Sequence, residues 1–592
     1  MRFRKWRLAP SLWSRHVTRQ PFARLVEHFL VRLARGGQDA SSSEFELGAG
    51  ALLGLLAAPG AFQCFLLLDK YSTFLNWMRG RLRSNLYLTS VPDKYEFIAL
   101  AMAVTGIVTV LKWDKILPDS QDYLNLAPLP VPPRNILLAN AAAIAIAVII
   151  FSIDVNGLPV LLFPLFVSAA AQTTTAAFLA FAAAHAACVM LASVFTFCAV
   201  FALLGALGAV LPREVFRAWS SWVRGVLLVA FIMLLLSGFA GAALAREVLL
   251  QPNSLLHYLP SLWFLGLYQS LQHAGPARLA ALAPMAVWGS VSAFLLMVAA
   301  YALSYRRRFA ASLESGSAPS EQRIFTLVVA GLDLFASRAA GFPRACHRFV
   351  VRALLRNETH RLWIAVALGL GYLLAFQSAS ETLSAGESGR DILPEGPLLQ
   401  APLIAAYLLI LGLRLAIDLP AGVPANWIFR SVLDPRENET VGVARQVILS
   451  FVTPLVLLPS LVLSIWRWGV LTGVVQTLYV LAVCLCLLEA LLAGYRKVPL
   501  TCPMPGFRDN LLMLCLVQFL GFELFTRFGA GLERWMFADP ARFALLPAAM
   551  LWGWWWNRRR IRDAREAGEL EEGITFENIR RPAVERMDLS SG

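Results

Sequence analysis

Long apolar runs alternate with short polar connectors along the whole chain. A run of about 20 apolar residues is long enough to cross the hydrocarbon core of a bilayer as a helix. The pattern therefore predicts an all-α, polytopic membrane protein with about 12 transmembrane helices. The predicted spans are residues 47–68, 95–111, 136–151 with an extension towards 166, 174–211, 225–245, 279–303, 362–376, 398–417, 447–465, 470–492, 511–525 and 543–556.

Two of these runs are irregular. The third is interrupted by Asp154, Asn156, Gly157 and Pro159, which mark a polar break. The fourth, residues 174–211, is too long for one straight crossing, so it is either a tilted, broken helix or two helices.

Two basic amphipathic stretches divide the spans into halves with a shared plan. Each stretch carries apolar residues at helical spacing between arginines and is expected to lie in the cytoplasmic headgroup layer. A hairpin of two spans, a polar connector and four more spans follow each stretch, so a duplication is a hypothesis. The predicted parts are an N-terminal amphipathic segment 1–46, a six-span half 47–304, a cytoplasmic linker with an amphipathic segment 305–360, a second six-span half 361–556 and a charged tail 557–592.

Charge places the loops relative to the membrane. The net charge is +14, and the arginines gather at the ends of apolar runs, as in 306–308 and 558–560. By the positive-inside rule, this distribution predicts that both termini lie in the cytoplasm. The basic residues form no continuous face with interleaved aromatics, so we expect no nucleic-acid partner.

The sequence offers little catalytic chemistry. The 8 cysteines lack the paired spacing of a zinc site, and the chain holds no phosphate-binding loop, H-E-x-x-H motif or nucleophile elbow. We therefore expect no catalytic residue, bound cofactor or metal. Among acids near the spans, Asp154, Glu489 and Glu523 favour exposure or snorkelling over a proton relay, and no deeper acid is evident.

Residues 246–278 join the fifth and sixth spans. They include the aromatic stretch HYLPSLWFLGLYQSLQH, residues 257–273, with prolines on either side. This composition favours short interfacial helices on the outer face, with a re-entrant element as the alternative.

Residues 113–140, WDKILPDSQDYLNLAPLPVPPRNILLAN, form the first polar connector. Asp119 can cap a short helix that the prolines from Pro128 onwards end, so the segment is stiff enough for a docking surface. It resembles the first cytoplasmic connector of bacterial ATP-binding-cassette (ABC) exporter permeases of the second type. The residues that match the L-x-P-D turn and L-x-P-L-P-V run of that family are Leu117, Pro118, Asp119, Leu126, Pro128, Leu129, Pro130 and Val131, with no residue between Leu117 and Pro118.

The resemblance implies a permease subunit without its own ATPase motifs. ATP would be used by cytoplasmic ABC ATPase subunits, two per chain if both halves are equivalent, which dock on the connectors. The loop sequences PANWIFR, residues 424–430, and KVPLTCPMPG, residues 497–506, look like those of large permeases in the same group. The residues implied to couple to the ATPase are Pro118, Asp119, Asp122, Tyr123, Arg430 and Asp434.

The chain departs from the family in size, because a simple member has six spans and dimerises. Three other classes stay open. A secondary carrier of the major-facilitator kind would also have six plus six spans, but the Gly-Asp-Arg loop pattern after the second span is absent. The others are an intramembrane enzyme acting on lipid-linked substrates, which would need acidic or histidine clusters, and a membrane scaffold.

Overall fold

The computed structural model places two helical units. It describes residues 21–34, 49–71, 90–116, 132–171, 174–237, 258–272, 277–313, 329–332, 342–384, 396–419, 440–492, 495, 499–500, 511–545, 547–548, 555 and 559. Over these ranges the secondary structure is helical without strands, and 9 helices are long and apolar enough to cross a membrane. The all-α class is thus confirmed for the described residues, and the nine apolar helices fit a multi-pass membrane protein. The units are Met1–Pro319 and Ser320–Gly592, divided within the predicted linker.

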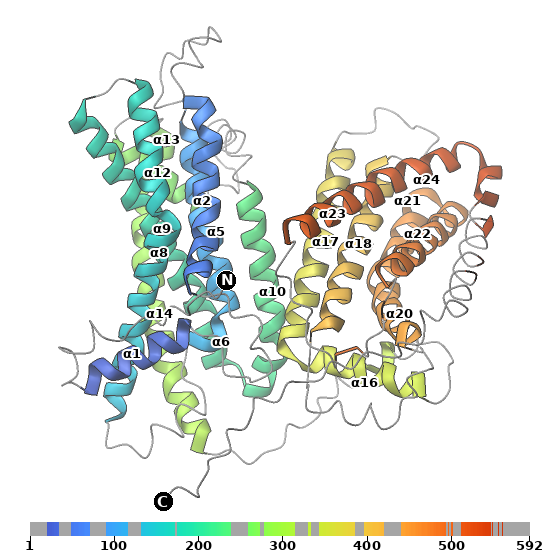
Figure 1. Cartoon of the computed structure of the whole chain (residues 1–592), viewed down its shortest axis with the longest axis horizontal. Coiled ribbons are helices and arrows are strands. Elements are labelled where there is room, and N and C mark those ends of the chain that lie inside the picture. The colour runs from blue at the N-terminus through green and yellow to red at the C-terminus, as the bar shows by residue number, and fades with distance from the viewer. Residues whose placement is uncertain are drawn as a thin grey trace, which may run out of the picture. The chain divides into compact units, whose positions relative to one another are not determined.

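Helix α5 is the central element of the first unit (Figure 1). It contacts α2, α8, α9, α10 and α12, and most of its length is buried. The sequence explains this position, because a helix that is apolar on all sides is stable only inside a bundle or a membrane. The helices of the unit are α1 Pro21–Ala34, α2 Ala49–Tyr71, α5 Val91–Leu111, α6 Trp113–Ile116, α8 Pro133–Ala171, α9 Thr175–Val210, α10 Arg213–Ser237, α12 Pro260–Gln272, α13 Ala277–Ala280 and α14 Ala283–Leu313.

Helices α8 and α9 resolve the two irregular runs. Helix α8 continues through the polar break, because the Asn156 amide donates to the Ser152 carbonyl (2.9 Å) and to the Ser193 hydroxyl of α9 (3.0 Å). Helix α9 is a single helix of 36 residues, capped by the Thr174 hydroxyl, which accepts from the Ala177 N–H. At about 1.5 Å per residue, both helices are longer than the roughly 30 Å hydrocarbon core.

The amphipathic helix α1 lies against the start of α8. Its buried face places Leu25 and Phe29 on Ile136, Ala139 and Ala143. It also contacts α6, the short helix that directly precedes the first connector. The N-terminal amphipathic segment is thus part of the same end of the unit as the connector.

Helix α18 has the corresponding central position in the second unit, where it contacts α16, α17, α20, α22 and α24. The amphipathic helix α16 packs on α17 and α20 and runs across their lower ends in Figure 1. Most of the predicted span 543–556 lies outside the described residues. The helices are α16 Phe342–Arg356, α17 Glu358–Ser384, α18 Gly396–Asp418, α20 Thr440–Val452, the π-helical turn η4 Thr453–Leu457, α21 Leu458–Trp468, α22 Val470–Leu491, α23 Leu511–Glu523, the π-helical turn η5 Leu524–Phe528, α24 Gly529–Phe537 and the 3₁₀ turn η6 Pro540–Ala544.

The close approach of α17 and α18 generates a first prediction. A Cβ atom on Gly412 would lie 2.2 Å from the Cβ of Ala367, which cannot move without its backbone. We expect Gly412→Ala to lower the free energy of unfolding by about 1–3 kcal/mol through overpacking. The matched control is Gly157→Ala in α8, where a Cβ meets nothing within 4 Å. Equal unfolding curves for the two variants in detergent would contradict the packing described.

Candidate functional site

The residues that the resemblance assigns to ATPase coupling lie outside the described part of the chain. This applies to Pro118, Asp119, Asp122 and Tyr123 in the first connector, and to Arg430 and Asp434 in the second. The structure does describe the segments on either side of each connector. These segments show how each connector is attached to its unit.

A buried polar node joins the two ends of the first connector. The Asn140 side-chain amide, on α8 after the connector, donates to the carbonyl of Ile116 before it (3.3 Å). The same amide donates to the Tyr301 hydroxyl of α14 (3.1 Å), which in turn donates to the Leu137 carbonyl (3.0 Å). We call this group and the rings beside it the connector anchor, which consists of Trp113, Ile116, Asn140, Phe201 and Tyr301.

Aromatic packing completes the connector anchor. The Trp113 side chain of α6 is 2% exposed, and its ring centroid lies 5.3 Å from that of Phe201 on α9. The Phe201 ring lies 6.0 Å from the Tyr301 ring. Such ring pairs contribute about 0.5–1.5 kcal/mol beyond the area that they bury. The short helix α6 is therefore fixed to α9 and α14 as well as to α8.

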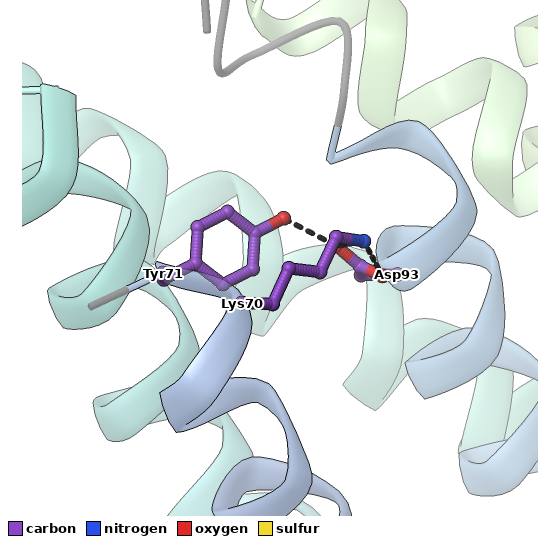
Figure 2. Close-up of polar contacts among 3 residues, drawn as sticks. All are labelled: Lys70, Tyr71 and Asp93. Atoms are coloured by element: carbon purple, nitrogen blue, oxygen red, sulfur yellow. Dashed lines mark hydrogen bonds and ion pairs between the residues drawn. The ribbon is translucent and has the colours of Figure 1, made fainter. Parts of the chain in front are cut away.

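The opposite end of α5 carries a charged cluster. Lys70 and Tyr71, at the end of α2, both donate hydrogen bonds to the carboxylate of Asp93 in the first turn of α5 (Figure 2). Asp93 is buried, whereas the side chain of Lys70 is 29% exposed. Pairing is required here because an isolated buried carboxylate is strongly unfavourable. The cluster thus fixes α2 against α5.

Lys94 extends the charged cluster to α12. Its side chain is fully buried, and its Nζ donates to the Gln272 Oε1 at 2.6 Å. The ammonium also lies 5.4 Å and 5.1 Å from the ring centroids of Phe181 and Tyr268. These distances are within the range of cation–π attraction. Adjacent residues of one helix therefore bind two different neighbours, Asp93 binding α2 and Lys94 binding α12.

Helix α12 is packed inside the first unit. The Tyr268 hydroxyl lies 3.0 Å from His185 Nδ1 on α9, and the Ser261 hydroxyl donates to Tyr95 on α5 at 3.3 Å. Burial raises the pKa of Tyr268 well above its ordinary value, so its hydroxyl keeps its proton. Helix α12 packs on α5, α9 and α14, so it is an integral part of the first unit.

The second unit has a corresponding node where α18 leads into the second connector. The Arg414 guanidinium pairs with Asp418, and its Nε donates to the Leu491 carbonyl at the end of α22 (3.2 Å). The guanidinium also stacks over the Tyr495 ring at 4.7 Å. The end of the central helix is therefore tied to its neighbours in both units.

Of the acids considered from the sequence, two have arginine partners. Glu489 pairs with Arg445 at 3.1 Å, and Glu523 pairs with Arg527 at 2.6 Å. Glu533 in α24, an acid that the sequence analysis did not consider, is fully buried. Sequence reasoning also missed the Lys70–Asp93 pair and Lys94. The available signal was a run of charged residues, at positions 93, 94 and 96, near the N-terminus of an otherwise apolar helix.

Metal binding has no geometric support in the described residues. No group of three or more His, Cys, Asp or Glu side chains there is arranged to hold a metal ion. Buried cysteines in the described residues are Cys64, Cys188, Cys198, Cys346 and Cys484, whereas Cys486 is exposed.

Comparison of the chain with protein-family models, with curated proteins and with solved structures gives no match. The resemblance to exporter permeases therefore depends on the first connector and on the loop sequences 424–430 and 497–506 alone.

The charged cluster yields a second prediction. Asp93→Asn removes the charge that Lys70 and Tyr71 bind, and charge-assisted hydrogen bonds contribute about 1.5–3 kcal/mol. We expect a loss of about 2 kcal/mol in the free energy of unfolding, measured by chemical unfolding in mixed micelles. A double-mutant cycle with Lys70→Met isolates the pair.

Asp154→Asn is the matched control for Asp93→Asn. Asp154 lies in the same unit, and its buried Oδ2 has no hydrogen-bond partner in the part of the chain that the structure describes. We expect the control to leave stability unchanged or to raise it. Additive effects of the Lys70 and Asp93 substitutions on stability would contradict the pairing of α2 with α5. An equal loss of stability in Asp93→Asn and Asp154→Asn would contradict it as well.

Proposed function

We propose that this chain is the membrane permease of an ABC-type exporter, coupled through its cytoplasmic connectors to separate ATPase subunits. The connectors contain the residues that would contact the ATPase. Helix α5 would transmit the movement of the first connector through the membrane unit. In it, the chain has two six-span halves in a bacterial inner membrane and both termini in the cytoplasm.

The parallel between the two units supports the two-half plan. In the first unit an amphipathic helix, α1, packs on α8, which follows the first connector. In the second, the amphipathic helix α16 packs on α20, which follows the second connector. The second long helix of each half, α5 or α18, has the central position and leads towards the connector. Two equivalent connectors would bind two ATPase subunits.

The connector anchor is the observation that carries the proposal. Asn140 joins the chain before the connector to the chain after it, so both ends of residues 117–131 are held on one rigid node. Buried polar groups are costly to leave unpaired, which makes the node resistant to local deformation. A displacement of the connector would then move α5, α8, α9 and α14 together.

Helix α5 would transmit this displacement across the unit. Its 21 residues extend for about 30 Å between the connector anchor and the charged cluster. In our proposal, ATP-driven displacement of the connector shifts α5 along its axis. The shift would separate Asp93 from α2 or Lys94 from α12 and so open the end of the unit away from the ATPase.

A secondary carrier is the second candidate, and the buried acid Glu533 favours it. A carrier would move its substrate without an ATPase, driven by an ion gradient. Transport by this chain alone in liposomes with an imposed proton gradient would favour the carrier. Transport only with an ATPase and ATP would favour the exporter.

The docking role of the connector is tested by charge reversal. We expect the double variant Asp119→Lys and Asp122→Lys to lose co-purification with the proposed ATPase partner, because it reverses both negative charges that the connector offers for docking. Glu571→Lys and Glu572→Lys in the charged tail make the same change in net charge away from the connector. If the connector variant co-purifies with the ATPase as well as the tail variant does, the connector is not the docking site.

The transmission role is tested at Tyr301. Tyr301→Phe removes the one hydroxyl that links Asn140 to α14, while the ring packing on Phe201 is retained. We expect the ATPase complex to form normally, with transport per ATP reduced about tenfold, equivalent to about 1.4 kcal/mol of coupling. Thr196→Val is the control, since it removes a buried hydrogen bond within α9 alone. Unchanged coupling in Tyr301→Phe would exclude the anchor from transmission.

A further inference from the structure

Glu533 lies on the buried face of α24 in the second unit. Gly529, Ala530, Glu533 and Met536 recur at helical spacing and are the buried residues of this helix. The helix packs on α18 and α22, and a Cβ on Gly529 would lie 3.0 Å from Leu403 of α18. Glu533 therefore points into the contact between α24 and its neighbours, and its side chain is 0% exposed.

Among the residues that the structure describes, the carboxyl group of Glu533 has no partner. Both oxygens are buried, and neither makes a hydrogen bond to a described residue. The Tyr479 hydroxyl of α22, which lies close enough to Glu533 to interact with it electrostatically, donates its hydrogen to the Gly529 carbonyl (2.8 Å). By contrast, Glu523 and Glu489 each have an arginine partner.

The charged and titratable groups of the surrounding elements do not compensate a negative charge on Glu533. On α18, Arg414 pairs with Asp418, and Tyr407 is occupied by Gln518. On α22, the facing titratable group is Tyr479, with Cys484, Cys486 and Glu489 further along the helix. In η5, Arg527 binds Glu523. Beyond α24, Arg542 stacks on Trp535, and the adjacent Arg534 is exposed.

We propose that Glu533 is a proton-binding site, which holds its proton while α24 is packed on α18 and α22 and releases it when the helix moves away. A buried carboxylate without a partner is far less stable than the neutral acid, so this packing requires the protonated form. Release of the proton leaves a carboxylate that must reach water or a cation. Proton binding and the position of α24 are therefore linked.

Two further observations agree with this assignment. Burial raises the pKa of Glu533 well above its ordinary value. The π-helical turn η5, Leu524–Phe528, directly precedes α24, and such turns are frequent at functional sites. The site does not depend on an ATPase, and its test uses this chain alone, so it can fail or hold independently of the exporter proposal.

Infrared difference spectroscopy of the full-length protein in detergent tests the proton directly. We expect a carbonyl band of a protonated carboxylic acid near neutral pH that disappears as the pH rises and is missing in Glu533→Gln. Glu523→Gln, which alters a paired carboxylate ten residues earlier, should keep the band. A spectrum in which Glu533→Gln removes no acid band would overturn the proposal.

Thermal unfolding against pH gives a second readout. A carboxyl whose pKa is raised by folding stabilises the protein at acid pH, and this contribution is lost as the pH rises through the folded-state value. We therefore expect wild type to lose stability towards alkaline pH relative to Glu533→Gln, whose amide stays neutral. Parallel pH profiles would contradict proton binding. If sodium at fixed pH stabilises wild type but not Glu533→Gln, the site binds a sodium ion. That result would overturn the proposal of a proton-binding site.

Discussion

Asp93 and Lys94 begin a helix that is otherwise apolar and buried on all sides, and their need for partners constrains the first unit. An unpaired charge in this position would cost several kcal/mol, which is a large part of the stability of a folded domain. Asp93 therefore requires α2, which supplies Lys70 and Tyr71, and Lys94 requires α12, which supplies Gln272. Two neighbouring residues thus fix two helices at defined positions around α5.

The distribution of these polar contacts separates positions that are fixed from positions that can slide. After Tyr95, whose hydroxyl accepts from Ser261, α5 packs on its neighbours mainly through apolar side chains, whose attraction is not directional. Packing of this kind tolerates small axial shifts, whereas hydrogen bonds at either end hold only in one register. For α5 to move along its axis, the hydrogen bonds of Asp93 and Lys94 at one end, or those of Asn140 at the other, would have to break and re-form with other partners.

The sequence predicted the helices because span length and apolar composition are local properties. It did not predict which charges meet, because Lys70 and Asp93 lie 23 residues apart and Lys94 and Gln272 lie 178 apart. Asn156 illustrates the same limit, since it suggested a break in α8 until its bonds to Ser152 and Ser193 were known. Its effect on the helix depends on a neighbour that the local pattern does not reveal.

Glu523 and Glu533 show how two similar acids acquire opposite roles. Glu523 has an arginine one turn later, and the two charges pair at the surface of their helix. Glu533 also has an arginine beside it, but adjacent residues on a helix point about 100° apart, so Arg534 faces outward while Glu533 faces α18 and α22. Its spacing from Gly529 and Met536 was the sequence signal for burial. In the first unit a lysine thus neutralises the buried carboxylate of Asp93, whereas in the second unit a proton has this role at Glu533.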